Sequence, residues 1–262
     1  MSEQQDTFIS HLVELRDRLL RSLVAIGIVF LALFFYPGSG PIYDFLAAPL
    51  MHALPEGTKM IATGVITPFM VPVKVTALVA LLVALPYVLY QAWAFVAPGL
   101  YAHEKRLVLP LVIASTVLFL AGIAFCYYLV FGKVFAFINS FAPQSITPAP
   151  DIEAYFGFVL TMFLAFGVTF EIPVIVIVLA RAGIVTVEQL KSARPYVIVG
   201  AFVVAAVVTP PDVLSQLLLA LPMCGLYELG LVLARFVARK PGESDWKAPS
   251  DAEMERELGK NE

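Results

Sequence analysis

The chain has 262 residues, a formal net charge of -3, a hydrophobic fraction of 60% and a mean hydropathy of +0.87. This composition excludes an ordinary soluble domain, and several long uncharged runs indicate an integral membrane protein. The small net charge gives no sign of a nucleic-acid partner. Both cysteines lie inside apolar runs, which disfavours a disulfide framework.

The N-terminal stretch "HLVELRDRLL", residues 11–20, precedes the first apolar run and is rich in charge. If residues 7–21 are helical, leucines line one face, and Glu14 and Arg18 form an i,i+4 ion pair on another face. From the residues alone, this pattern predicts a helix at the membrane surface with ordinary salt bridges.

Six apolar runs predict an all-α integral membrane protein with six transmembrane helices. The runs occupy residues 22–36, 75–96, 107–132, 154–180, 196–209 and 213–237. We expect one membrane domain over residues 1–240, while residues 241–262 are charged and apolar-poor and predict a disordered cytoplasmic tail. Fourteen residues extend only about 21 Å as a helix, and Pro222 interrupts the sixth run. The fifth and sixth helices are therefore expected to be short.

The distribution of Lys and Arg predicts the orientation of these spans. Fourteen of the 17 basic residues fall on the side shared by both termini, and three (Lys59, Lys74 and Lys133) fall on the other side. Basic residues concentrate in cytoplasmic segments, so both termini are predicted to be cytoplasmic. On the opposite side, residues 37–72 are punctuated by Pro and Gly and predict short helical pieces that form an outer cap.

Sequence motifs of catalysis are absent. The three histidines have no metal-ligand spacing, and the chain contains no Gly-rich phosphate loop, nucleophile elbow or HExxH motif. We therefore predict no catalytic residues, no metal, no cofactor and no enzymatic activity.

Three polar residues inside or beside the apolar runs need an explanation. Glu171 lies within the fourth run, where a charge is costly and often functional. It is either a carboxylic acid bonded inside a helix bundle, or a contact for a partner helix or a proton-linked site. Thr209 and Gln216 flank the turn between the fifth and sixth helices. They either bond each other or meet another helix.

Several motifs, in order over roughly residues 7–240, resemble the TatC family, the multispanning component of the twin-arginine protein translocase. They are "HLVELRDRL", "PLMHALPEG", "YQAWAFVAPGLYAHEKR", "AFGVTFEIPV", "RPYVIVGAFVVAAVVTPPD" and "LLALPMCGLYELG". The resemblance implies a receptor in the bacterial inner membrane that binds Arg-Arg signal peptides of folded cargo at the cytoplasmic face. It also implies self-association in a multi-copy complex, recruitment of TatB-like and TatA-like single-span partners, and transport driven by the proton-motive force.

The resemblance also assigns roles to residues. The family's two signal-binding carboxylates correspond to Glu14 and Glu104, with Arg16 and Phe95 at neighbouring motif positions. Asp17 departs from the pattern, because relatives often carry a basic or neutral residue there. This acid either attracts the signal peptide or pairs with Arg21.

Further positions follow from the same resemblance. Thr209, Gln216 and Glu171 correspond to the surface that contacts partner helices, on a concave, cup-like bundle. Pro49, Pro210 and Asp212 correspond to structural positions, the first bracing the outer cap. A function from another class, a proton-coupled small-solute transporter using Glu171, stays open at this point, although the internal repeats common in such transporters are not visible.

Overall fold

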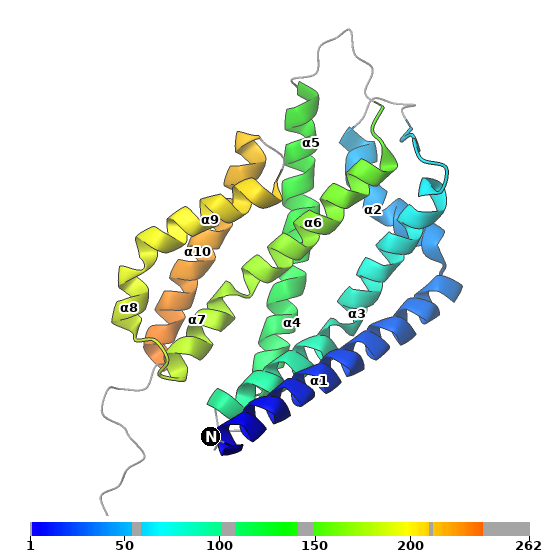
Figure 1. Cartoon of the computed structure of the whole chain (residues 1–262). Coiled ribbons are helices and arrows are strands. Elements are labelled where there is room, and N and C mark those ends of the chain that lie inside the picture. Colours follow the sequence, from blue (N-terminus) through cyan, green and yellow to red (C-terminus); the bar gives the residue numbers. More distant parts are fainter. Residues whose placement is uncertain (1, 54–58, 101–107, 141–148, 210–211, 238–262) are drawn as a thin grey trace, which may run out of the picture.

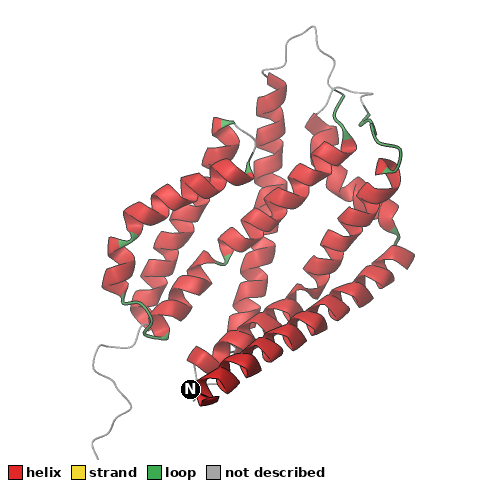
Figure 2. Cartoon of the chain, in the orientation of Figure 1, coloured by secondary structure: helices red, strands yellow, loops and turns green. Residues whose placement is uncertain are grey.

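The structure is a computed structural model that describes residues 2–53, 59–100, 108–140, 149–209 and 212–237. These residues form an all-α fold, in which most of the helices are long (Figure 2). Helix α1, Ser2–Phe35, is continuous, so the charged N-terminal stretch and the first apolar run form one helix. It packs along α3, Thr67–Leu100, and the two helices lie side by side in Figure 1.

The segment between α1 and α3 contains helix α2, Ser39–Ala53. This helix is one of the short helical pieces predicted for residues 37–72. Pro49 lies inside this helix. Because proline has no N–H, it cannot bond the carbonyl of Phe45 four residues earlier. The hydroxyl of Tyr127 donates to that carbonyl at 2.7 Å, which ties α2 to the third span.

The third apolar run forms one helical rod from three pieces. Helix α4, Val108–Phe125, continues through a π-helical turn, η2, Cys126–Val130, into α5, Phe131–Ser140. The wider turn is closed by the N–H of Phe131 donating to the carbonyl of Cys126. The rod extends beyond the end predicted at residue 132.

The fourth run is interrupted at Glu171. Helix α6, Ile152–Phe170, ends there, and α7, Ile172–Arg181, begins with Pro173 in its first turn. Proline fits the first turn of a helix because the N–H groups there have no intrahelical partner. The span over both helices agrees with the predicted residues 154–180, with a break where the charge lies.

The last part of the chain forms a short helix and a hairpin. Helix α8 is Val187–Ser192, α9 is Arg194–Val208 and α10 is Val213–Val237. The short α9 is as predicted, but the prediction of a short sixth helix is wrong, because α10 has 25 residues and continues through Pro222. A helix tolerates an internal proline in a membrane when neighbouring groups and local adjustments compensate for the lost bond.

The main core lies between α2, α3, the α4–α5 rod and α6, where Phe131, Phe156 and Phe166 are fully buried. A smaller cluster around Leu231 joins α7, α8 and α10. Small residues allow close helix contacts: Gly122 of α4 lies directly against the backbone of Phe166 on α6. Within the described part of the chain, five spans are long and apolar enough to cross a membrane, and α9 is a shorter apolar helix.

Figure 1 shows how the ends of these helices are distributed. The N-terminal end of α1, the end of α3, the start of α4, and the end of α10 lie at the bottom of the view. Helix α2 and the upper end of α5 lie at the top. The start of α1 and the end of α10 therefore lie on the same side of the bundle.

Candidate functional site

Glu14 lies on the N-terminal part of α1, and its side chain is 37% exposed. One of its carboxylate oxygens, Oε1, accepts hydrogen bonds from Nε and Nη2 of Arg18, at 2.9 and 2.6 Å. The other oxygen, Oε2, is 3.9 Å from Nδ1 of His11. Arg18 therefore bonds one oxygen of a partly exposed carboxylate, whose other oxygen lies near His11.

Two contacts hold this part of α1 against the end of α3. The ring of His11 stacks on that of Phe95, with centroids 4.5 Å apart. Arg18 donates from Nη1 to Oε1 of Gln91 at 3.3 Å, and Gln91 is buried. Glu14 and Phe95, two of the predicted binding residues, are thus brought to one place by His11, Arg18 and Gln91.

Arg16 points elsewhere on α1. Its guanidinium bonds the adjacent Asp17 from Nε at 3.0 Å and from Nη2 at 2.8 Å. Within the described part of the chain, Asp17 pairs with Arg16 and not with Arg21, and attraction of the signal peptide by Asp17 stays a prediction. Glu104, the second predicted carboxylate, lies outside the described residues, in the connection between Leu100 of α3 and Val108 of α4.

A second polar site surrounds Glu171, at the break between α6 and α7. The side chain is only 8% exposed, and neither carboxylate oxygen has a hydrogen-bond partner among the described residues. It lies beside Ser115 of α4, whose hydroxyl accepts a hydrogen bond of 3.0 Å from Nε1 of Trp93. Three helices therefore contribute polar groups to this part of the bundle.

The two polar residues of the α9–α10 hairpin bond to α9 and not to each other. The hydroxyl of Thr209 donates to the carbonyl of Ala205 at 2.9 Å, and Nε2 of Gln216 donates to the carbonyl of Phe202 at 3.2 Å. No hydrogen bond joins Glu171 to either residue within the described structure. At the other end of the hairpin, Glu228 pairs with Arg194 at 2.7 Å, which ties α10 to the start of α9.

Comparison with known proteins identifies the family. The model for the family described as Sec-independent protein translocase protein (TatC) matches residues 10–222. The chain belongs to the TatC family. It is 51% identical to the TatC protein of Haemophilus influenzae, over 96% of this chain and 97% of that protein. It is 47% identical to TatC of Escherichia coli K12, over 91% and 92% of the two chains.

A solved structure supports the same assignment. The crystal structure of a twin-arginine translocase receptor, TatC, superposes with a TM-score of 0.76 at 38% identity. It covers 87% of this chain and 100% of the solved chain. The chain is thus a multi-pass membrane protein with the TatC fold, a core component of a protein translocase and not an enzyme. Membership of the TatC family favours protein transport over small-solute transport.

The structural positions implied by the TatC resemblance are partly described. Pro49 lies inside α2 and has no N–H to donate to the carbonyl of Phe45. That carbonyl accepts a hydrogen bond from the hydroxyl of Tyr127 instead. Asp212 precedes α10, and its Oδ1 accepts from the N–H of Ser215 at 2.7 Å, as a helix-capping residue does. Pro210 lies outside the described residues.

Sequence reasoning missed the residues that connect the sites to their surroundings. Gln91, Trp93 and Ser115 form contacts between α1, α3 and α4, yet no role was predicted for them. A signal was available, because Gln91 is an uncharged polar residue in an otherwise apolar span, and such groups need a partner in a membrane.

Proposed function

We propose that this chain is the receptor that binds the Arg-Arg signal peptide of folded cargo through Glu14 and Glu104, with Arg16 and Phe95 beside them. The observation that supports this proposal best is the hydrogen bonding and exposure of the Glu14 carboxylate. Arg18 binds one carboxylate oxygen, and the side chain stays partly exposed at the end of α1 that packs on Phe95. The segment that carries Glu104 continues directly from α3, the helix of Phe95.

Arginine is the cation that such a site favours. Its planar guanidinium offers a fork of N–H donors that a carboxylate accepts through two bonds, whereas the ammonium of lysine acts as a point charge. Arg18 shows on Glu14 that this carboxylate accepts two donors of one guanidinium. Two carboxylates on neighbouring segments can bind two consecutive arginines in the same way.

The membrane orientation belongs to the same proposal. All six spans cross the bacterial inner membrane as a concave, cup-like bundle, with α9 crossing a locally thinned bilayer. Both termini are cytoplasmic, because most Lys and Arg residues lie on their side. Residues 1–240 form a single membrane domain, and residues 241–262 form a cytoplasmic tail.

The α9–α10 hairpin and the buried Glu171 are the proposed contact surface for the helices of TatB-like and TatA-like single-span partners. Thr209 and Gln216 present polar groups in an apolar hairpin, and the Glu171 carboxylate lacks a partner among the described residues. Several copies assemble with these partners, and the proton-motive force drives transport. An intramembrane carboxylate of this kind is often functional.

The signal site is tested by charge reversal. Glu14→Lys and Glu104→Lys are each expected to abolish binding of an Arg-Arg signal peptide and export of a folded reporter, while the protein still inserts into the membrane. Glu188→Lys is the matched control, because it makes the same charge change on the exposed surface of α8. Normal export by both site variants would refute the assignment.

The hairpin surface is tested by a photo-crosslinking amino acid at Gln216, with Leu109 of α4 as an exposed apolar control. In membranes that contain the assembled translocase, the Gln216 position is expected to crosslink to a single-span partner and the Leu109 position is not. Equal crosslinking at both positions would contradict the proposal that the partners bind at the hairpin.

A further inference from the structure

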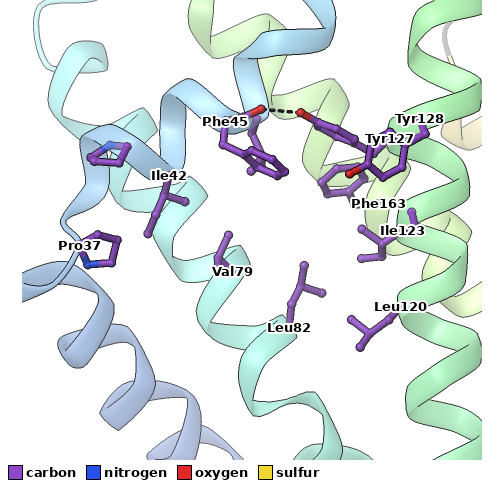
Figure 3. A pocket seen from close by; sticks show the side chains of 13 residues that line it. Pro37, Ile42, Phe45, Val79, Leu82, Leu120, Ile123, Tyr127, Tyr128 and Phe163 are labelled. Carbon is purple, nitrogen blue, oxygen red and sulfur yellow. Dashed lines mark hydrogen bonds between the residues drawn. The ribbon is translucent and has the colours of Figure 1, made fainter.

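A cavity of about 430 Å³ lies between α2, α3, the α4–η2 segment and α6. Figure 3 shows its walls: Val79 and Leu82 of α3 face Leu120 and Ile123 of α4, and Ile42 of α2 lies above them. None of the residues with a proposed role in signal or partner binding lines this cavity.

The walls of the cavity carry few groups that could form a hydrogen bond with water. Apart from two tyrosines, the lining side chains are hydrocarbon or proline rings. The hydroxyl of Tyr127 is already used, because it donates to the Phe45 carbonyl that Pro49 leaves free (Figure 3). Tyr128 is 75% exposed. Since a buried water needs two to four polar partners, and an apolar cavity of about 150 Å³ already stays dry, water is a poor occupant.

Apart from α2, the helices around the cavity belong to spans that are long and apolar enough to cross a membrane. Val79, Leu120 and Phe163 belong to three different membrane spans. Leu120 is 42% exposed and Phe45 60% exposed, so the walls continue into the outer apolar surface of the protein. Leu82 is fifteen residues along α3 from Thr67, or about 22 Å at 1.5 Å per residue. The cavity therefore extends from beneath α2 toward the middle of the membrane.

We propose that this cavity binds one acyl chain of a membrane phospholipid from the leaflet on the α2 side. At about 30 Å³ per water molecule, its volume equals that of roughly 14 waters, and a methylene group is close to a water in volume. The cavity thus has room for most of one acyl chain. Side chains that line an empty space lose van der Waals contacts on that side. A bound acyl chain would restore these contacts for the walls of the cavity.

A transmembrane helix does not fit this space. A helix with its side chains is about 10–12 Å across, so the cavity volume corresponds to about one helical turn. The roof formed by α2 also limits the length of any straight rod that enters from the side, whereas an acyl chain bends freely. The shape therefore favours a lipid chain over a partner helix or the apolar part of a signal peptide.

The bound chain also has a structural consequence. It fills the space between α2 and the α4–η2 segment, which are otherwise joined across this cavity by the bond from Tyr127 to the Phe45 carbonyl and by the stacking of the same two rings at 5.2 Å. The lipid chain would stabilise α2 in its position over the spans.

The test uses the purified full chain in detergent with one photoreactive phospholipid, carrying a diazirine on its acyl chain, added at a stoichiometric amount. Label is expected on the α3 and α4 segments around Leu82 and Leu120. Label spread evenly over exposed apolar faces, such as Leu23 and Ile28 of α1, would overturn the proposal.

A variant that fills the cavity provides the second measurement. Leu82→Trp is expected to lower several-fold the amount of phospholipid that stays bound in native mass spectrometry. Val117→Trp places the same ring on the exposed face of α4, outside the cavity, and should retain the lipid as the unmodified chain does. If both variants retain the same amount of phospholipid, the proposed site is refuted. An unchanged far-ultraviolet circular dichroism spectrum of Leu82→Trp verifies that this variant is folded.

A third measurement separates the lipid from a protein occupant. A photo-crosslinking amino acid at Leu120, in membranes with the assembled translocase, is expected to yield no crosslinked single-span protein or signal peptide. Such a crosslink would assign the cavity to a partner and overturn the proposal. Binding of the signal peptide at Glu14 is measured in a separate experiment. Failure of the lipid proposal would therefore not refute the proposed receptor function.

Discussion

Arg18 donates two hydrogen bonds to the same oxygen of Glu14, from Nε at 2.9 Å and from Nη2 at 2.6 Å. The same guanidinium donates through Nη1 to the buried Gln91 on α3. An arginine of the chain itself therefore occupies half of the carboxylate proposed to bind an arginine of the signal peptide. An incoming guanidinium has to share Glu14 with Arg18 or displace it.

We predict that Arg18→Gln tightens binding of an Arg-Arg signal peptide and narrows the preference for it over a Lys-Lys peptide. Removing Arg18 frees both oxygens of Glu14 and leaves its charge unopposed, so that a lysine can bind it as a point charge. The pair is partly exposed, so the expected gain is about 0.5–1 kcal/mol, or roughly two- to fivefold in Kd. Fluorescence anisotropy with labelled peptides measures both affinities.

The opposite result is equally informative for Arg18. Weaker binding by a folded Arg18→Gln variant would show that Arg18 holds Glu14 in its binding position and does not compete with the peptide. Arg21→Gln is the control, because it removes an exposed arginine of the same helix that is not one of the donors to Glu14.

The positions of several apolar helices could be predicted, because a long uncharged run is a strong signal along the chain. The predicted run 213–237 coincides with α10, and the run 154–180 differs from the α6–α7 span by two residues at its start and one at its end. The prediction that Pro222 shortens the sixth helix is wrong, because the loss of one backbone hydrogen bond does not end a helix. Neighbouring helices decide whether such a bond is needed.

The contacts between the spans could not be predicted in the same way. His11 and Phe95 stack although 84 positions separate them in the sequence. A helix surrounded by lipid is apolar on all sides, so periodicity does not identify the face that meets a neighbour. For the same reason the sequence did not indicate that Tyr127 would meet the carbonyl left free by Pro49.

Gly122→Ala is predicted to destabilise the bundle where α4 crosses α6. A Cβ atom at Gly122 would lie 2.6 Å from the carbonyl oxygen of Phe166 and 2.9 Å from the ring of Phe170. Because the first contact is with backbone, the helices must separate, and overpacking of this kind costs about 1–3 kcal/mol. The midpoint of thermal unfolding in detergent is expected to fall. Gly157→Ala on α6 should leave it unchanged or raise it slightly, since its Cβ would meet nothing within 4 Å.

Ser115→Ala is predicted to destabilise the protein through Trp93. The Ser115 hydroxyl is fully buried and accepts the indole N–H of Trp93, so its removal leaves that donor without this partner. Leaving a buried donor unpaired costs about 1–3 kcal/mol, and the half-buried Trp93 is expected to lie at the lower end of this range. Thr116→Val is the matched control, because the Thr116 hydroxyl bonds only the Val112 carbonyl of its own helix, at 2.7 Å. An equal loss of thermal stability in the two variants would contradict the role of Ser115.

Asp151, at the start of α6, is predicted to make the stability of the outer loop depend on pH. The N–H of Ala154 and the hydroxyl of Thr63 donate to its carboxylate, at 3.0 and 2.7 Å, and these bonds lower its pKa below the ordinary value of 3.8. A carboxylate whose pKa is lowered by folding stabilises the folded state above its unfolded pKa. This contribution is lost as the pH falls from about 4 through the lowered pKa.

Asp151→Asn removes this carboxylate and keeps a residue that can cap the helix. Asparagine also caps a helix but does not titrate, so the variant is expected to lose less thermal stability than the unmodified chain between pH 5 and pH 3. The difference between the two curves therefore reports Asp151 together with its neighbour Glu153, whose pKa the charge of Asp151 raises. Asp44→Asn on the exposed surface of α2 is the control for a generic loss of charge. Parallel curves for Asp151→Asn and the unmodified chain would show that the link from Thr63 to α6 does not depend on the charge of Asp151.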